Sequence, residues 1–163
     1  MATKLDPIAE FREDHRKVRD GLLDIIKALQ SKDVVKAREI LGNLNVLVGP
    51  HFRYEEETLY PALRTLLGEY VDQLISEHDG VISTARACLA LLQKDTLTDT
   101  EAKDAANAAR AILIHVSNCD GLAILSERLT QSELDDLGDK FAAARAKGIS
   151  LLDWAATIRT TRA

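Results

Sequence analysis

Along most of the chain, apolar residues recur at steps of three and four, which is the spacing that places them on one face of an α-helix. Only short polar or glycine-containing stretches interrupt this pattern. Because the connections between the segments are short, successive helices must run antiparallel. The sequence therefore predicts an all-α fold, an up-down-up-down four-helix bundle whose long segments cover about residues 7–29, 34–68, 69–94 and 98–128.

The second segment contains two prolines. Proline has no N–H donor and disfavours helix in the residue before it. Gly49-Pro50 therefore predicts either a kink in one long helix or two helices nearly end to end, and Pro61 predicts a further bend.

A shorter fifth helix is expected after the bundle. Thr130 with Glu133 three residues later forms a capping box, and Gly148 is a typical residue for the end of the helix. The tail, residues 149–163, is expected to pack across one end of the bundle. With no linker or repeat inside the chain, we expect a single domain over residues 1–163, with its core at about 7–148.

Composition limits the partners and the compartment. The net charge is −5, and the longest basic cluster is Arg16-Lys17, so neither nucleic acid nor an anionic membrane is expected as a partner. The first residues lack the apolar core of a signal peptide, and no uncharged apolar run approaches the roughly 18 residues of a membrane span. We therefore expect a cytoplasmic protein in which both cysteines, Cys88 and Cys119, remain thiols.

The four histidines fall one on the apolar face of each long segment. Their depths along the predicted helices agree within roughly two turns, so the imidazoles are expected to converge on one layer of the interior. Imidazoles that face an apolar core are costly unless a cation or a hydrogen-bond network receives their nitrogens. This placement indicates a metal site formed by His15, His51, His78 and His115.

Two carboxylates strengthen this interpretation. Glu55 follows His51 by four residues on the same face, and Asp120 follows His115 by five. Nitrogen ligands with two carboxylates suit iron, manganese or zinc, and the spacing does not choose among them. A structural bundle with polar interior positions is the alternative. The neighbouring residues are expected outside the ligand set, with Glu56 and Glu57 on the solvent side. Tyr54 and Tyr60 are expected as packing residues or as groups that contact the ligands.

One stretch carries a specific resemblance. Residues 51–61, HFRYEEETLYP, resemble the H-F-x-x-E-E-x-x-L-[FY]-P signature of the hemerythrin-like (HHE) cation-binding domains. The accompanying motifs also match: Asp14-His15 in the first segment, Glu77-His78-Asp79 in the third, His115 in the fourth and a Leu-Thr-x-x-Glu segment at 129–133. The resemblance covers about residues 7–148.

The resemblance implies a four-helix bundle around a non-haem diiron centre, with two iron ions bridged by carboxylates and an oxo or hydroxo group. It assigns His15 and His51 to one iron, His78 and His115 to the other, and Glu55 to a bridge. Asp120 matches the position of a second bridge. A five-residue step turns an α-helix by about 500°, so Asp120 faces inward only if the helix bulges locally, which Gly121 would permit.

The chain departs from the family pattern at two positions. Cys119 stands where many members have a glutamate; it is read as a packing residue, with ligation or redox chemistry as alternatives. Leu74 stands where oxygen-carrying members have a histidine, so one iron lacks a nitrogen ligand. Water, Glu77 or a nearby tyrosine are the candidates for that position, which would otherwise stay open.

The function implied is binding of, or reaction with, dioxygen, peroxide or nitric oxide at a buried diiron site, in sensing, storage or detoxification. Whether the protein is an enzyme is left open. A metal-free structural or protein-interaction bundle is the alternative from another class, and zinc or manganese hydrolysis in the same pocket is a third. Homodimerisation through an exposed apolar strip is also left open.

Overall fold

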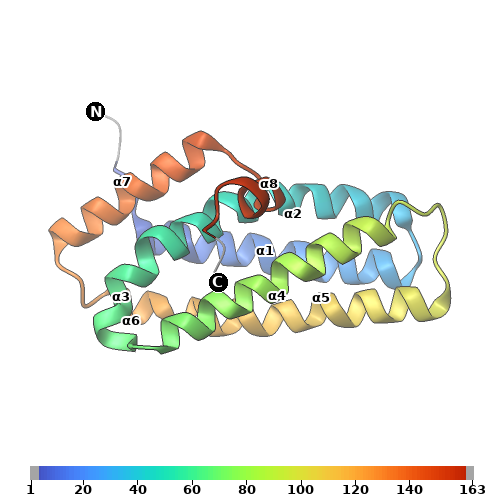
Figure 1. The fold of residues 1–163 in the computed structure, drawn as a ribbon, viewed down its shortest axis with the longest axis horizontal. Coiled ribbons are helices and arrows are strands. Elements are labelled where there is room, and N and C mark those ends of the chain that lie inside the picture. The colour runs from blue at the N-terminus through green and yellow to red at the C-terminus, as the bar shows by residue number, and fades with distance from the viewer. Residues whose placement is uncertain (1–3, 161–163) are drawn as a thin grey trace.

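The computed structural model describes residues 4–160, which form a bundle of long helices with two further helices along one side (Figure 1). The all-α fold predicted from the periodicity is confirmed, and the described residues contain no strand. The elements are α1 (Pro7–Gln30), α2 (Val34–Tyr54), the π-helix η1 (Glu55–Leu59), α3 (Tyr60–Leu67), α4 (Tyr70–Leu91), α5 (Asp99–Asp120), α6 (Leu122–Ser126), α7 (Gln131–Lys147) and α8 (Leu151–Thr157).

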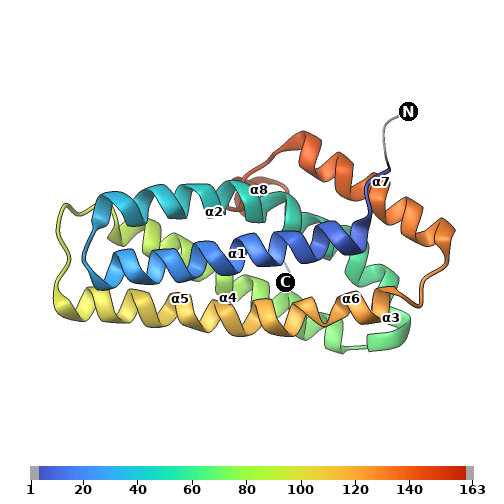
Figure 2. The ribbon, with the colours of Figure 1, turned by 180° about the vertical axis from the view of Figure 1, so that it is seen from behind.

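The four long rods of the bundle are α1, α2 with η1 and α3, α4, and α5 with α6. Seen from behind, α1 lies between α2 and α5 and packs along both (Figure 2). Residues that typically cap helices are found at the helix ends. Asp6 caps α1 by accepting hydrogen bonds from the N–H groups of Ile8 and Ala9, and Thr130 and Glu133 form the expected capping box of α7. Gly148 ends α7 in the left-handed conformation, at φ 59°.

The irregular turn of the second rod is not where Gly49-Pro50 predicted it. α2 continues through Pro50 without interruption, and the helix changes instead at Glu55–Leu59, where the N–H of Tyr60 donates to the carbonyl of Glu55. Pro61 explains the position, because its ring crowds the carbonyl four residues earlier, and a wider π turn relieves that contact. The wider turn also brings residues five apart onto one face, so Glu55 and Tyr60 are both fully buried.

The fourth rod also differs from its prediction. The bulge expected near Gly121 is a break: α5 ends at Asp120, and the short α6 follows. By length and composition alone, the stretch Asp99–Ser126 would suffice to cross a membrane. In the bundle it packs along α1 with His115 and Cys119 buried, and 28% of its most apolar window is buried.

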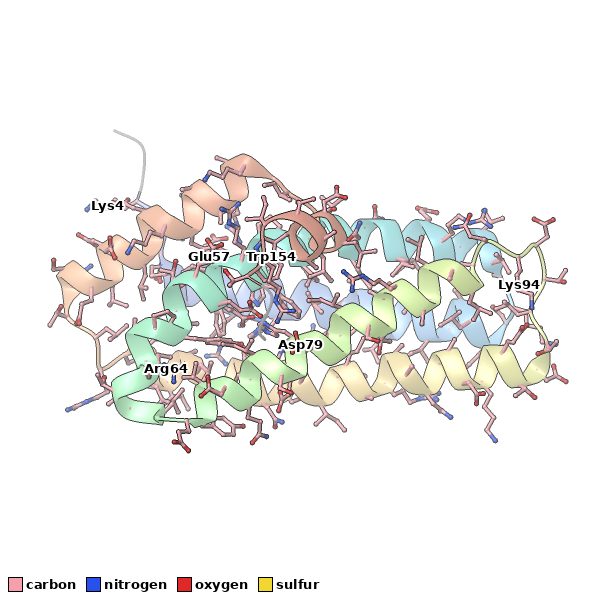
Figure 3. The ribbon with its side chains drawn as sticks, viewed as in Figure 1. Lys4, Glu57, Arg64, Asp79, Lys94 and Trp154 are labelled. Carbon is pink, nitrogen blue, oxygen red and sulfur yellow. The ribbon has the colours of Figure 1, made fainter. Side chains whose placement is uncertain are left out.

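The tail does not pack across one end of the bundle. Instead, α8 lies against the side of α2 and α4 (Figure 1). Gly49 permits this contact, because a Cβ atom at Gly49 would lie 2.1 Å from the carbonyl oxygen of Ile149. Trp154, on the side of α8 that faces the bundle, is 1% exposed (Figure 3). α7 and α8 therefore add buried residues along the side of the bundle rather than across its end.

Candidate metal centre

The four histidines form one buried layer, called here the histidine layer, between two apolar clusters. The cluster toward α3 is rich in aromatic residues, and the cluster toward the α4–α5 loop is mostly aliphatic. Each ring comes from a different rod: His15 from α1, His51 from α2, His78 from α4 and His115 from α5. Their exposed fractions are all 8% or less, so water does not solvate these imidazoles.

One half of the layer joins His15, His51 and Glu55. The Nε2 atoms of the two rings are 3.1 Å apart. Oε1 of Glu55 lies 3.3 Å from Nε2 of His51 and 3.8 Å from Nε2 of His15. Ligand atoms of these three buried residues lie within 4.8 Å of one another, close enough to hold a single ion.

The other half shares the same glutamate. Glu55, His115 and Cys119 form a second group whose ligand atoms lie within 4.8 Å of one another. Nε2 of His78 lies 3.0 Å from Oε2 of Glu55, and the Cys119 thiol donates to Oε1 over 2.7 Å. The Tyr60 hydroxyl is 3.1 Å from Nε2 of His78. Glu55 therefore stands between two sets of donors.

A carboxylate contacts the Nδ1 atom of every histidine in the layer. A carboxylate accepts hydrogen bonds, so each contact assigns a proton to Nδ1 and directs Nε2 toward the interior. These four outer carboxylates are Asp120 on His15 at 3.0 Å, Asp14 on His51 at 3.0 Å, Glu56 on His78 at 2.9 Å and Glu77 on His115 at 2.6 Å.

The outer carboxylates change three expectations from the sequence. Asp120, expected as a second bridge, instead contacts the outer nitrogen of His15. Glu56, expected on the solvent side, has a side chain only 11% exposed and orients His78. Glu77, a candidate for the position left by Leu74, contacts His115 instead. The hydroxyl 3.1 Å from Nε2 of His78 belongs to Tyr60, one of the two tyrosines expected either to pack or to contact the ligands.

Two arginines from the C-terminal helices hold two of these carboxylates. Arg145 of α7 donates to Asp14 over 2.9 Å, and Arg159, just beyond α8, donates to both oxygens of Glu56, over 2.8 and 3.0 Å. Sequence reasoning missed both arginines. They lie about 130 and 100 residues from their partners in sequence, and no local pattern links them.

The charges of the layer are strongly coupled. Burial by itself would raise the pKa of Glu55, yet the charge of the neighbouring His51, together with the close His15 and His78, holds that pKa well below its usual range. Burial likewise opposes the charged form of His51, but Glu55 and Asp14 raise its pKa to about 9. For Cys119, burial and the adjacent Glu55 raise the pKa of the thiol well above its usual value.

One atom shows that these hydrogen bonds do not complete the site. Oε2 of Glu55 is buried and has no hydrogen-bond partner, although Nε2 of His78 lies 3.0 Å away. With the proton of His78 on Nδ1, this nitrogen has none to offer the oxygen. A buried carboxylate oxygen without a partner is costly. Imidazole nitrogens, a shared carboxylate and a thiol are donors that first-row transition metals accept. The residues present therefore fit a metal centre.

The surroundings of the layer are aromatic. Phe52 stacks on His78 with ring centroids 3.7 Å apart, and Phe11 stacks on His51 at 5.4 Å. Leu74, at the position of the missing histidine, is fully buried in the cluster toward α3, and Tyr54 stacks on Phe141 as a packing residue. The side chains of Phe52 and Phe11 thus pack against the rings of His78 and His51.

Comparison with known proteins gives one match. The family model described as the hemerythrin HHE cation-binding domain matches residues 6–123, which contain the whole histidine layer and Glu55. No curated protein and no solved structure shows significant similarity to the chain.

Proposed function

The chain belongs to the hemerythrin HHE cation-binding domain family, and from this premise we propose that it is a non-haem iron protein that binds or reacts with dioxygen, peroxide or nitric oxide. The observation that carries the proposal is the buried carboxylate of Glu55, which two donor groups share and of which one oxygen lacks a hydrogen bond. Two cations that share a buried site need an anion between them, and Glu55 is the anion in that position.

Each half of the layer would hold one iron ion. His15, His51 and Glu55 would hold the first, and Glu55, His115 and Cys119 the second, with His78 completing that half. Iron in such a site supplies reversible one-electron redox change and an open coordination position for a small ligand. Each outer carboxylate accepts a hydrogen bond from Nδ1. This hydrogen bond directs Nε2 inward and also raises the basicity of the imidazole as a ligand.

Cys119 replaces a carboxylate on the fourth rod, and its proton must be accounted for. The thiol donates to Oε1 of Glu55 over 2.7 Å, and its raised pKa keeps it protonated without metal. A thiol that coordinates a cation is deprotonated, so metal loading would release this proton and free Oε1. We propose Cys119 as a thiolate ligand on this basis.

Tyr60 provides a proton donor beside the same half. Burial and the nearby Glu55 raise the pKa of its hydroxyl well above the usual value, so the hydroxyl keeps its proton. It lies between Nε2 of His78 and Sγ of Cys119, at 3.1 and 3.5 Å. There it can donate a hydrogen bond to a small polar ligand, while Phe52 and Leu74 keep the surroundings apolar.

The experiment is metal loading under controlled gases. Metal-free protein is incubated with ferrous iron without oxygen, freed of excess metal and analysed for iron and for its optical spectrum before and after dioxygen, hydrogen peroxide or nitric oxide is added. We expect about two irons per chain and a change of spectrum with at least one of the three. A colourless protein that binds no iron and melts at the same temperature with and without it would overturn the proposal and favour a metal-free bundle.

Three variants test the ligand face. His51→Ala and Glu55→Ala should lose most of the bound iron, because each removes a ligand that is 2% exposed or less. Glu57→Ala is the matched control, since the Glu57 side chain is 47% exposed and pairs with Arg53. Elemental analysis of the purified protein separates iron from zinc or manganese.

A further inference from the structure

The four-helix bundle encloses a cavity of about 520 Å³ that none of the preceding chemistry uses. It is lined by all four long rods, and its wall is mainly aliphatic. His15, His51 and His115 line one end, and Leu29 and Leu91 line the other. Along α1 the lining runs from His15 to Leu29, which is about 21 Å at 1.5 Å per residue. The cavity is therefore long and narrow and reaches the histidine layer.

The cavity opens between α4 and α5. Of the residues that line it, Ser83, Ala87 and Asp104 are exposed, and all three belong to these two helices. Small side chains on both helices leave the opening. Apart from the histidines, the charged residues in the lining are Glu101, which pairs with Lys94, and the exposed Asp104. No lysine or arginine of the described residues 4–160 lines the cavity.

At the histidine layer, the nitrogens of two of the three lining rings already have partners. The outer nitrogen of His15 faces Asp120, that of His51 faces Asp14, and their inner nitrogens face each other. Ser83 and Thr84 of α4 provide the hydroxyl groups near the open side. An occupant would thus meet apolar surface along most of the cavity and hydroxyl groups at Ser83 and Thr84.

We propose that this cavity binds an elongated aliphatic molecule with an uncharged polar end, such as a long-chain alcohol. A dry apolar cavity of about 150 Å³ holds one benzene, so 520 Å³ corresponds to a chain of about twenty non-hydrogen atoms. A diatomic gas fills only a small part of it. The polar end lies at Ser83 and Thr84, about one and a half turns past His78 along α4, and the hydrocarbon extends away from the histidine layer, toward Leu29 and Leu91. Within the described part of the chain, no lysine or arginine lines the cavity, so an anionic end would enter without a cation beside it.

The test uses the protein as purified, with its metal content measured in parallel. The fluorescent probe 1-aminoanthracene is bound first and then displaced by dodecanol or by dodecanoate, which has the same chain length and a negative end. We expect dodecanol to displace the probe, and dodecanoate to do so about tenfold more weakly because no lysine or arginine among the lining residues that the structure describes accompanies its carboxylate. Equal displacement by both, or none by dodecanol, overturns the proposal.

A matched pair of variants locates the binding. Ala105 lines the cavity on α5, whereas Ala111 is exposed on the same helix and does not line it. Ala105→Phe should weaken dodecanol binding by at least about tenfold, and Ala111→Phe should leave it unchanged. Equal binding by the two folded variants contradicts a cavity site. Neither residue belongs to the histidine layer, so the iron content should stay the same in both.

Cys88 gives a second measurement in the unaltered chain, which decides the matter if Ala105→Phe does not fold. Cys88 lines the cavity and is partly exposed, whereas Cys119 is fully buried. Dodecanol should slow the reaction of Cys88 with a small thiol reagent, and an unchanged rate at saturating dodecanol argues against the site. Iron content and dodecanol binding are separate readouts, so failure of one proposal is distinguishable from failure of the other.

Discussion

Asp14→Asn separates the outer carboxylates from the ligands themselves. Asp14 is 2% exposed and uses both oxygens: Oδ2 faces Nδ1 of His51 at 3.0 Å, and Oδ1 accepts from Arg145 at 2.9 Å. Asparagine has nearly the same shape but only one acceptor oxygen. Its NH₂ group must therefore face either the protonated Nδ1 of His51 or the Arg145 guanidinium, and one buried donor loses its partner.

The expected size of the effect follows from that lost bond. A buried donor left without an acceptor costs about 1–3 kcal/mol of the free energy of unfolding. At about 2–4 °C per kcal/mol for a chain of this size, the Tm should fall by about 2–12 °C. Loss of a carboxylate that orients a ligating histidine typically lowers metal affinity by about 10–100-fold. The Tm is measured by circular dichroism, and the affinity by titrating cobalt(II) or zinc(II) against a chelating dye.

Glu10→Gln is the control, because Glu10 is the other carboxylate that binds Arg145. Its side chain is 40% exposed and does not touch a histidine, so this change should cost less than about 1 kcal/mol and leave metal affinity unchanged. If folded Asp14→Asn binds metal as tightly as the unaltered protein, the outer carboxylates do not tune the centre. An equal loss in Glu10→Gln would assign the effect to Arg145 instead.

Three further predictions follow from other parts of the structure. Cys119→Ser should alter the spectrum of the iron-loaded protein more than Asp120→Asn does. The cysteine change removes a proposed ligand, whereas the aspartate change only weakens the contact with an outer nitrogen. The reverse order would contradict thiolate ligation. Gly49→Ala should destabilise the protein by about 1–3 kcal/mol and shift the fluorescence of the single tryptophan, because the added methyl group meets the backbone leading into α8. Gly42→Ala is the control and should be neutral or stabilising, because an added Cβ atom there has no neighbour within 4 Å. In metal-free protein, the pKa of His51 is raised from 6.5 to about 9, so its stabilising contribution is complete below pH 6.5 and disappears as the pH rises through 9. The free energy of unfolding, measured with urea, should thus fall by up to about 3 kcal/mol between these pH values, and a flat profile would show that His51 is neutral in the fold.

The positions of the histidines could be predicted because they depend on helical periodicity alone. A ring on the apolar face of each rod must enter the bundle, and rods of known length fix its height. The same argument placed Glu55 beside His51, one helical turn away. These residues needed no knowledge of how the rods pack.

The outer carboxylates could not be found in this way. Glu56 follows Glu55 directly, and in a regular α-helix the two side chains point about 100° apart, which led to its expected place on the solvent side. The structure puts the wide turn at Glu55–Leu59, and α4 passes close enough for Glu56 to reach His78. Asp120 was assigned to the inside by its family motif, whereas α5 ends there, and its carboxylate contacts the outer nitrogen of His15 and pairs with Arg12. In both cases, tertiary contacts decided the role.

The C-terminal segment supplies two arginines beside the histidine layer, although it lies beyond the matched residues 6–123. A buried carboxylate is costly unless a cation accompanies it. The side chains of Asp14 and Glu56 are 3% and 11% exposed, and these are the two that receive Arg145 and Arg159. Glu77 and Asp120, at 24% and 33%, reach solvent and receive no arginine from these helices. The arginines are thus placed where water cannot compensate the charge. Removing α7 and α8 would leave Asp14 and Glu56 without these cations beside the histidines they orient, so a chain cut to the matched residues should bind metal more weakly than the whole one.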